Sequence, residues 1–191
     1  MDAMRRQARR QNLAHEEGFG LIEAIFAAAI LVIGLTALAG LFAQSLGFLQ
    51  HTRDDLFAKQ KAVEALEEVY SARNDASVGF ALIQNVSKGG IFNDGFQSLF
   101  VPGANGIVGT SSDTTTYESE TLPGPDGIVG TSDDVIVPLI NFQRQILIEV
   151  VINPDGTVNP DVRKITVTIR VSSAGPGAHD YTVTGYISRY Q

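Results

Sequence analysis

The sequence contains no cysteine, and only three of its 191 residues are histidine. The absence of cysteine excludes a disulfide framework, a Cys-ligated zinc site, an iron–sulfur cluster and a thiol nucleophile. The histidines stand singly, at His15, His51 and His179, and no His-Glu-x-x-His, Gly-x-Ser-x-Gly or phosphate-loop pattern is present. We therefore expect that the protein is not an enzyme.

Charged residues are also scarce, at 18% of the chain, against about a quarter in an average soluble domain. The formal net charge is -7, which argues against a broad nucleic-acid footprint. The basic residues Arg163, Lys164 and Arg170 are too few to form a DNA-binding patch. No nucleic-acid partner is expected, and a DNA-uptake receptor is disfavoured.

The shortage of charged residues is due mainly to one segment. From Ala24 to Gln50, a run of 27 residues, there is no Asp, Glu, Lys or Arg. As a helix this run would be about 40 Å long, whereas a bilayer core is about 30 Å thick. It is also longer than the apolar region of a secretory signal, which has about 7–15 residues. The sequence therefore predicts a membrane-spanning helix.

Flanking charges predict the orientation of this helix. Arg5, Arg6, Arg9 and Arg10 precede it, whereas Arg53 after it is followed at once by two aspartates. The positive-inside bias places the N-terminus in the cytoplasm and the rest of the chain on the other side of the membrane.

A single carboxylate, Glu23, lies at the start of the apolar run, five residues after Gly18. An acid within a membrane is costly, about 2.5–3.5 kcal/mol at mid-bilayer, and needs a partner. The basic segment, the Gly18–Phe19 pair and Glu23 together resemble the class III leader of type IV prepilins. Residues 20–46 resemble the first helix of minor pilins, closest to the PilV class. One departure is Gly20, where many pilins have threonine.

This resemblance implies a processing route and a set of partners. Prepilin peptidase would remove residues 1–18 as a leader by cutting between Gly18 and Phe19, and Phe19 would be N-methylated. Glu23 would neutralise the amine of a neighbouring pilin subunit during assembly. Further partners would be the inner-membrane assembly platform and the lipid bilayer. The protein would lie in the bacterial inner membrane, with its head periplasmic or extracellular, and then in a cell-surface or periplasmic filament.

The apolar helix, residues 19–50, is expected to continue as an amphipathic helix over residues 51–73. Leu56, Val63 and Tyr70 recur at intervals of seven. The remaining apolar positions of the stripe are Leu66, Phe57 and Val69. Charged residues occupy the positions between them, and no proline occurs before Pro102. This periodicity predicts one helix from about Phe19 to about Ala72.

Residues 74–191 are expected to form a globular head. Residues 74–101 are rich in glycine and predict a connector with one short helix near residues 80–84. Three β-branched segments, Phe142–Ile152, Arg163–Val171 and Asp180–Tyr190, are separated by turns at residues 153–156 and 174–177. They predict an antiparallel meander whose apolar face is covered by the long helix. The expected fold class is α+β, and the resemblance implies the type IV pilin fold.

A glycine-rich motif occurs twice in the head, at residues 102–113 and 123–134, with nine of twelve positions identical. The second copy resembles the calcium loop of major pseudopilins. Its carboxylates Asp126, Asp133 and Asp134 are candidate calcium ligands, because calcium takes six to eight oxygens on flexible turns. Asn105 and Asp113 make the first copy a weaker candidate. The alternative is that both copies are Asp/Gly turns that cap hairpins.

The predicted function is that of a minor type IV pilin that assembles into, or primes, a pilus-like filament. Two alternatives stay open. One is a minor pseudopilin of a type II secretion system. The other is a membrane-anchored calcium-binding or adhesive module that never polymerises, and such a simple anchor would keep its leader.

Overall fold

The computed structural model describes residues 20–74, 78–172 and 178–190. The predicted leader, residues 1–18, and the predicted cleavage point between Gly18 and Phe19 therefore lie outside the described residues. The chain divides into two compact units, one that ends at Leu49 and one that begins at Gln50. A single helix, α2 (Leu21–Asn74), contributes to both units. The predicted helix is thus confirmed over the described residues.

The first unit consists, in its described part, of α2 up to Leu49. Nearly every side chain of this stretch is exposed, including large apolar ones such as Leu21, Ile30 and Phe48. The helix is long and apolar enough to cross a membrane. Because a helix satisfies its own backbone hydrogen bonds, such a segment is stable in hydrocarbon without further partners.

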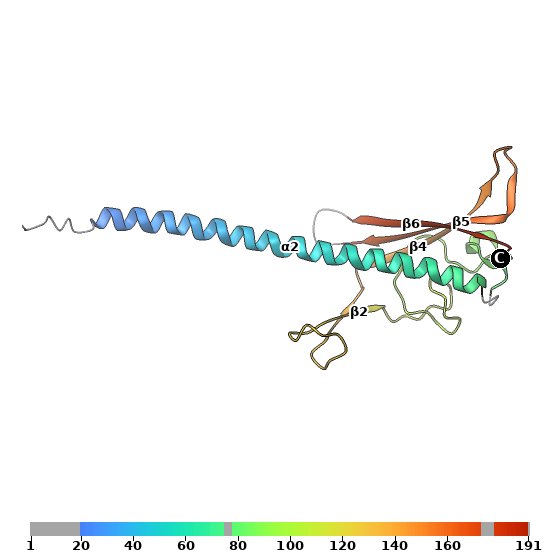
Figure 1. Ribbon diagram of the computed structural model, residues 1–191, viewed down its shortest axis with the longest axis horizontal. Coiled ribbons are helices and arrows are strands. Elements are labelled where there is room, and N and C mark those ends of the chain that lie inside the picture. The colour runs from blue at the N-terminus through green and yellow to red at the C-terminus, as the bar shows by residue number, and fades with distance from the viewer. Residues whose placement is uncertain (1–19, 75–77, 173–177, 191) are drawn as a thin grey trace, which may run out of the picture. The chain divides into compact units, whose positions relative to one another are not determined.

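The second unit combines the rest of α2 with a small β-structure (Figure 1). Two short 3₁₀ helices follow α2, η1 (Phe80–Leu82) and η2 (Val86–Lys88). The strands are β1 (Gln97–Ser98), β2 (Ser119–Leu122), β3 (Val135–Pro138), β4 (Phe142–Ile152), β5 (Val158–Val171) and β6 (His179–Ser188). They form a four-stranded sheet in the order β1-β4-β5-β6 and a two-stranded ribbon, β2-β3. All pairings of these strands are antiparallel.

The predicted meander is confirmed by strands β4, β5 and β6. β5 begins at Val158, five residues before the predicted Arg163, because a register shift between Val150 and Val151 lets pairing resume at Asn159. The predicted turn at residues 153–156 is present, and Gly156 takes a φ of 82° there. The predicted turn at 174–177 lies outside the described residues. The predicted short helix near 80–84 is η1. The short strands β1, β2 and β3 were not predicted.

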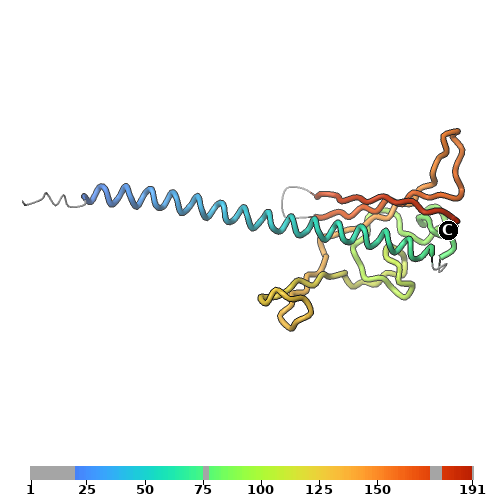
Figure 2. Tube along the Cα trace, in the orientation of Figure 1, coloured from blue at the N-terminus to red at the C-terminus, as the bar shows by residue number. Residues whose placement is uncertain are grey.

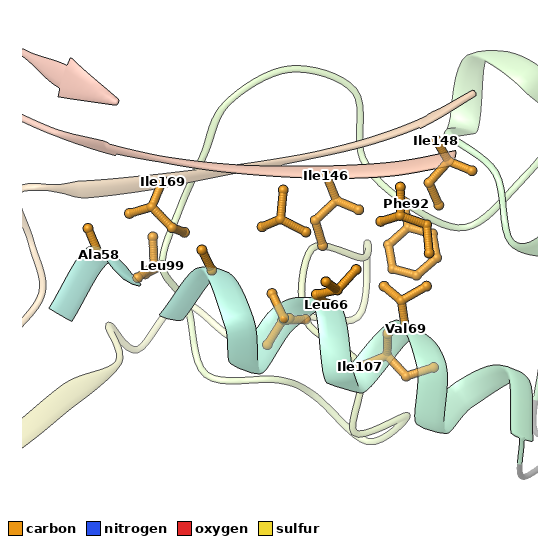
Figure 3. Close-up of a cluster of buried hydrophobic side chains, with 14 of the residues drawn as sticks. Ala58, Leu66, Val69, Phe92, Leu99, Ile107, Ile146, Ile148 and Ile169 are labelled. Atoms are coloured by element: carbon orange, nitrogen blue, oxygen red, sulfur yellow. The ribbon is translucent and has the colours of Figure 1, made fainter. Parts of the chain in front are cut away.

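The core lies between the sheet and one face of α2 (Figure 3). From the strands come branched side chains such as Ile146, Ile148 and Ile169, which are at most 3% exposed. From α2 come mainly small side chains, at Ala58, Ala62, Ala65, Val69 and Ala72. These recur at intervals of four and three, which places them on one face of a helix. Their small size lets the helix axis approach the sheet closely.

The buried face of α2 coincides only in part with the predicted apolar stripe, of which Phe57, Leu66 and Val69 are buried. Leu56 is 62% exposed and Val63 and Tyr70 are only half-buried, whereas Lys61, predicted to be on the charged side, is buried. The prediction assumed that α2 would contribute large apolar side chains to the core, but the sheet already supplies large branched side chains. Close packing is better served here by alanine, which fills the remaining narrow space.

Candidate functional site: apolar stem, paired loops and α2 groove

Glu23 lies in the first turn of α2, with its side chain exposed. Its backbone N–H donates a hydrogen bond to the Gly20 carbonyl at 2.9 Å. The positive end of a helix dipole favours a carboxylate at this position. All large apolar side chains around it, such as Leu21 and Ile22, are exposed as well. An acid at the apolar end of an exposed helix is suited to pairing with a cation from another molecule.

The two copies of the repeat, which we name the copy-one loop (102–113) and the copy-two loop (123–134), have the same conformation. Asn105 Oδ1 accepts a hydrogen bond from Ile107 N at 3.1 Å, and Asp126 Oδ1 accepts one from Ile128 N at 2.8 Å. Asp113 Oδ2 accepts from Gly109 N at 2.8 Å, and its equivalent, Asp134 Oδ2, accepts from Gly130 N at 2.6 Å. The shared sequence thus encodes a shared local structure.

The surroundings of the two loops differ. In the copy-one loop Ile107 and Val108 are 5% and 3% exposed and belong to the core. Their equivalents in the copy-two loop, Ile128 and Val129, are 60% and 61% exposed. The copy-two loop connects β2 to β3, and this ribbon projects away from the four-stranded sheet (Figure 2). One sequence motif is therefore used once as core and once as surface.

The predicted calcium ligands serve as hydrogen-bond acceptors of their own loops. Among the described residues, no group of three or more His, Cys, Asp or Glu side chains is placed to hold a metal ion. Asp133 accepts hydrogen bonds from the Thr131 hydroxyl and the Asp126 backbone N–H, which lower the pKa of its carboxyl. The calcium prediction for Asp126, Asp133 and Asp134, and for Asn105 and Asp113, gains no support from this geometry and is not carried further.

A compact ionic cluster that the sequence did not reveal lies between α2 and the strands. Lys61 Nζ is 3.1 Å from Glu118 Oε2, 3.1 Å from Glu120 Oε1 and 2.9 Å from Glu64 Oε2. Arg144 Nη1 of β4 is 3.0 Å from Glu118 Oε1. Glu118 therefore bridges two buried cations. Burial lowers the pKa of Lys61, but its carboxylate partners outweigh this and leave the pKa raised. Lys61 is therefore charged throughout the physiological pH range.

The copy-one loop is attached to α2 beside this cluster. Glu68 Oε2 accepts a hydrogen bond from Val108 N at 3.0 Å. Burial raises the pKa of the Glu68 carboxyl, although the bond from Val108 opposes this shift. Burial likewise raises the pKa of Asp113, against the hydrogen bonds from Gly109 and Thr110. Seating the loop on the helix thus removes two carboxyl groups partly from water.

A shallow, open surface hollow of about 680 Å³, which we name the α2 groove, lies along α2. Its lining residues combine apolar side chains with charged and amide groups, namely Leu56, Phe57, Lys59, Gln60, Val63, Glu64 and Glu67. All belong to the second unit. Leu56 and Val63, two members of the predicted apolar stripe, therefore line an open part of the surface.

Comparisons with protein-family models, with curated proteins and with solved structures find no match to this chain.

Proposed function

We propose that this protein is a minor type IV pilin, a membrane-inserted subunit that is processed at its N-terminus and joins a pilus-like filament. The observation that carries the proposal is the apolar half of α2, which has Glu23 in its first turn and whose large apolar side chains are exposed from Leu21 to Leu49. In the sequence, a basic segment ending in Gly18 and Phe19 precedes this helix.

The exposed apolar helix requires two different environments during the life of such a subunit. Before assembly, the bilayer covers the side chains of residues 21–49, with the N-terminus in the cytoplasm and the head outside. In a filament, the same side chains pack against the helices of neighbouring subunits. Glu23 then receives its counter-charge from the amine that a neighbour's Phe19 gains on cleavage, which offsets the cost of burying the carboxylate.

The second unit is consistent with this role. The outer half of α2 packs on a small antiparallel sheet through an alanine-rich face. The resulting α+β arrangement, a long helix on a small antiparallel sheet, is compatible with the type IV pilin fold that the leader motif implies. A minor pseudopilin of a type II secretion system would have the same layout. The two functions differ in the proteins with which the subunit assembles.

Processing is the first test of the proposal. The full-length chain is expressed in membranes with and without a prepilin peptidase, and its intact mass is measured. We expect a chain that begins at N-methylated Phe19 only when the peptidase is present. Replacing Gly18 by a bulky residue, as in Gly18→Leu, should prevent the cut. A chain that keeps Met1 despite an active peptidase would instead support a simple membrane anchor.

Assembly is the second test. The variant Glu23→Ala should still insert and be cleaved, because neither step uses the carboxylate. It should be lost from sheared filaments, whereas Glu23→Asp, which keeps the charge, should be retained in part. Normal incorporation of Glu23→Ala would remove the assembly role from this residue.

A further inference from the structure

The β2-β3 ribbon and the residues that follow it expose several branched apolar side chains. Ile128 and Val129, at the tip of the copy-two loop, are 60% and 61% exposed. Val135, Ile136 and Ile140 are between 53% and 69% exposed. We name these five side chains the ribbon patch. The loop that carries the tip is ordered by its own hydrogen bonds, so the patch is a defined surface from which water is favourably removed.

Contacts with α2 fix the course of the ribbon within the second unit. Val108 of the copy-one loop is held by Glu68 of α2. Further along the chain, Glu120 of β2 accepts a hydrogen bond from Gln60 at 3.4 Å. From the copy-one loop to β2 the chain therefore runs back along α2, toward the start of the second unit at Gln50. Figure 2 shows that the copy-two loop lies level with the first turns of α2 in this unit.

The loop tip lies at the height of the expected membrane surface. The run without charges ends at Gln50, and Gln60 is about 15 Å further along the helix axis. Beyond Glu120, β2 continues to Leu122, which covers about 7 Å, and the copy-two loop follows. A bilayer has a hydrocarbon core about 30 Å thick and measures about 40–45 Å with its headgroups. The tip can therefore reach the headgroup layer of a bilayer whose hydrocarbon ends at Gln50.

The charges of the ribbon indicate which lipids it would meet. Residues 119–138 contain no Lys or Arg and four acidic residues. Glu120 pairs with Lys61 at 3.1 Å. The three aspartates of the copy-two loop accept hydrogen bonds from N–H groups of their own loop. Without basic residues the ribbon cannot attract an anionic membrane, so its apolar side chains fit a surface of zwitterionic headgroups.

We infer that the ribbon patch docks on the bilayer that α2 crosses, with the Ile128–Val129 tip inserted among zwitterionic lipid headgroups. Because α2 already anchors the chain, the tip stays close to the bilayer, and a small gain in apolar burial is enough to hold it there. The inference rests on the membrane insertion that is part of the proposed function. It does not require processing or filament assembly.

Tryptophan fluorescence tests the docking, and the sequence contains no tryptophan that would add background. The full-length chain with Ile128→Trp is reconstituted in phosphatidylcholine vesicles, with and without lipids that carry bromine on their acyl chains. Bromine quenches only those tryptophans that lie close to it. We expect the quenching of Ile128→Trp to be at least about twofold stronger than that of the control Ile152→Trp.

Ile152 is a matched control because it is also branched and is 56% exposed. It is the last residue of β4 and precedes the turn between β4 and β5. Figure 1 shows this turn at the opposite end of the second unit from the copy-two loop. A tryptophan at Ile152 should therefore stay in water.

A second reporter separates docking from the affinity of tryptophan itself for the membrane interface. Ile136→Trp reports from β3 and is combined with Ile128→Asp. Its quenching should fall at least about twofold, because a charge at the tip opposes insertion. Replacing about a third of the lipid by phosphatidylglycerol should also weaken the quenching, and added salt should restore it by screening the repulsion. Thermal unfolding should be unchanged in Ile128→Asp, because this side chain is exposed.

Two outcomes would overturn the inference. Equal quenching of Ile128→Trp and Ile152→Trp would show that the ribbon has no preference for the bilayer. A blue shift of Ile128→Trp that grows with the protein-to-lipid ratio, without quenching, would show that the tip packs on a second copy instead.

The uncleavable variant Gly18→Leu separates this inference from the proposed function. If Ile128→Trp is quenched equally with and without Gly18→Leu while the wild type never enters filaments, the pilin function alone is defeated. If the wild type is processed and incorporated but Ile128→Trp is not quenched in vesicles, the docking alone is defeated.

Discussion

At the scale of single residues, the repeat provides a built-in comparison between Gly109 and Gly130. Both have positive φ values, 73° and 97°, which L side chains rarely adopt. A Cβ at Gly109 would also lie 2.8 Å from Ile146 Cδ1, whereas a Cβ at Gly130 would meet nothing within 4 Å. The difference between the two sites is therefore one of packing, because the backbone strain is common to both.

We expect Gly109→Ala to destabilise the protein more than Gly130→Ala. The positive φ costs about 1–2 kcal/mol at either site, and the close approach to Ile146 adds about 1–3 kcal/mol of overpacking at Gly109 alone. Denaturant unfolding of the full-length chain in detergent, followed by circular dichroism, measures the difference. Equal losses in the two variants would mean that the core relaxes around the added methyl group.

Glu118 is the residue on which the buried ionic cluster depends, because it contacts both Lys61 and Arg144. We expect Glu118→Gln to lower the free energy of unfolding by about 3–5 kcal/mol, because it removes the anion that pairs with buried Arg144, whereas Lys61 keeps Glu64 and Glu120. Glu149→Gln is the control. Glu149 pairs with Lys164 at 3.7 Å with both side chains at least 40% exposed, and such a pair contributes about 0–1 kcal/mol. A loss at Glu118 no larger than that at Glu149 would contradict the assigned role of the cluster.

At the scale of structural elements, the two loops show one motif in two environments. Their internal hydrogen bonds are equivalent, so the motif itself holds its shape whether or not it is packed. What differs is the neighbouring structure. The copy-one loop meets α2 and Glu68, whereas the copy-two loop is carried away from the sheet by the β2-β3 ribbon.

Replacing each of the two equivalent isoleucines by alanine should show how much each loop contributes to stability. Ile107→Ala is expected to cost about 2–5 kcal/mol, because it leaves a cavity in the core. Ile128→Ala should stay within about 0.5 kcal/mol of the wild type, as surface substitutions do. Thermal and denaturant unfolding of the two variants, under identical conditions, gives the comparison. A large loss of stability in Ile128→Ala would indicate that Ile128 is buried in the folded protein, contrary to this expectation.

At the scale of the whole molecule, the stability of the head should depend on pH through Glu68. Burial raises the pKa of Glu68 in the folded protein above its value in the unfolded chain, which is about 4.3. The neutral form is therefore favoured by folding. The stability from this group is fully present below the unfolded pKa and is lost as the pH rises through the folded pKa.

Glu68→Gln should accordingly be more stable than the wild type at pH 7, because glutamine still accepts the hydrogen bond from Val108 without burying a charge. This advantage should shrink as the pH is lowered through the raised pKa of Glu68 toward about 4.3. Melting curves of both proteins between pH 7 and pH 4 test the sign. An advantage of the glutamine variant that grows toward acid pH would contradict it.

The sequence by itself determined the elements whose physics is local. A run without charges from Ala24 to Gln50 specifies an apolar helix, because a helix satisfies its backbone groups internally. Alternating branched residues, as in Ile165, Val167 and Ile169, specify half-buried strands. The turn at residues 153–156 and the conformation of the paired loops also follow from local glycine and Asx chemistry. Glu23, which the sequence places at the start of the apolar run, lies in the first turn of α2, and its role in assembly stays a prediction.

Only the tertiary structure decided which faces are buried. The buried face of α2 consists largely of alanines, such as Ala58, Ala62 and Ala65, because the sheet opposite supplies large branched side chains. The sequence of α2 alone does not show which side chains lie opposite it. Lys61 is buried because Glu118, 57 positions later in the chain, provides its counter-charge. Strand β1 has two residues and exists only by pairing with β4. Likewise, copies of one motif that are nearly identical in sequence became core and surface, since burial depends on what a segment meets and not on the segment itself.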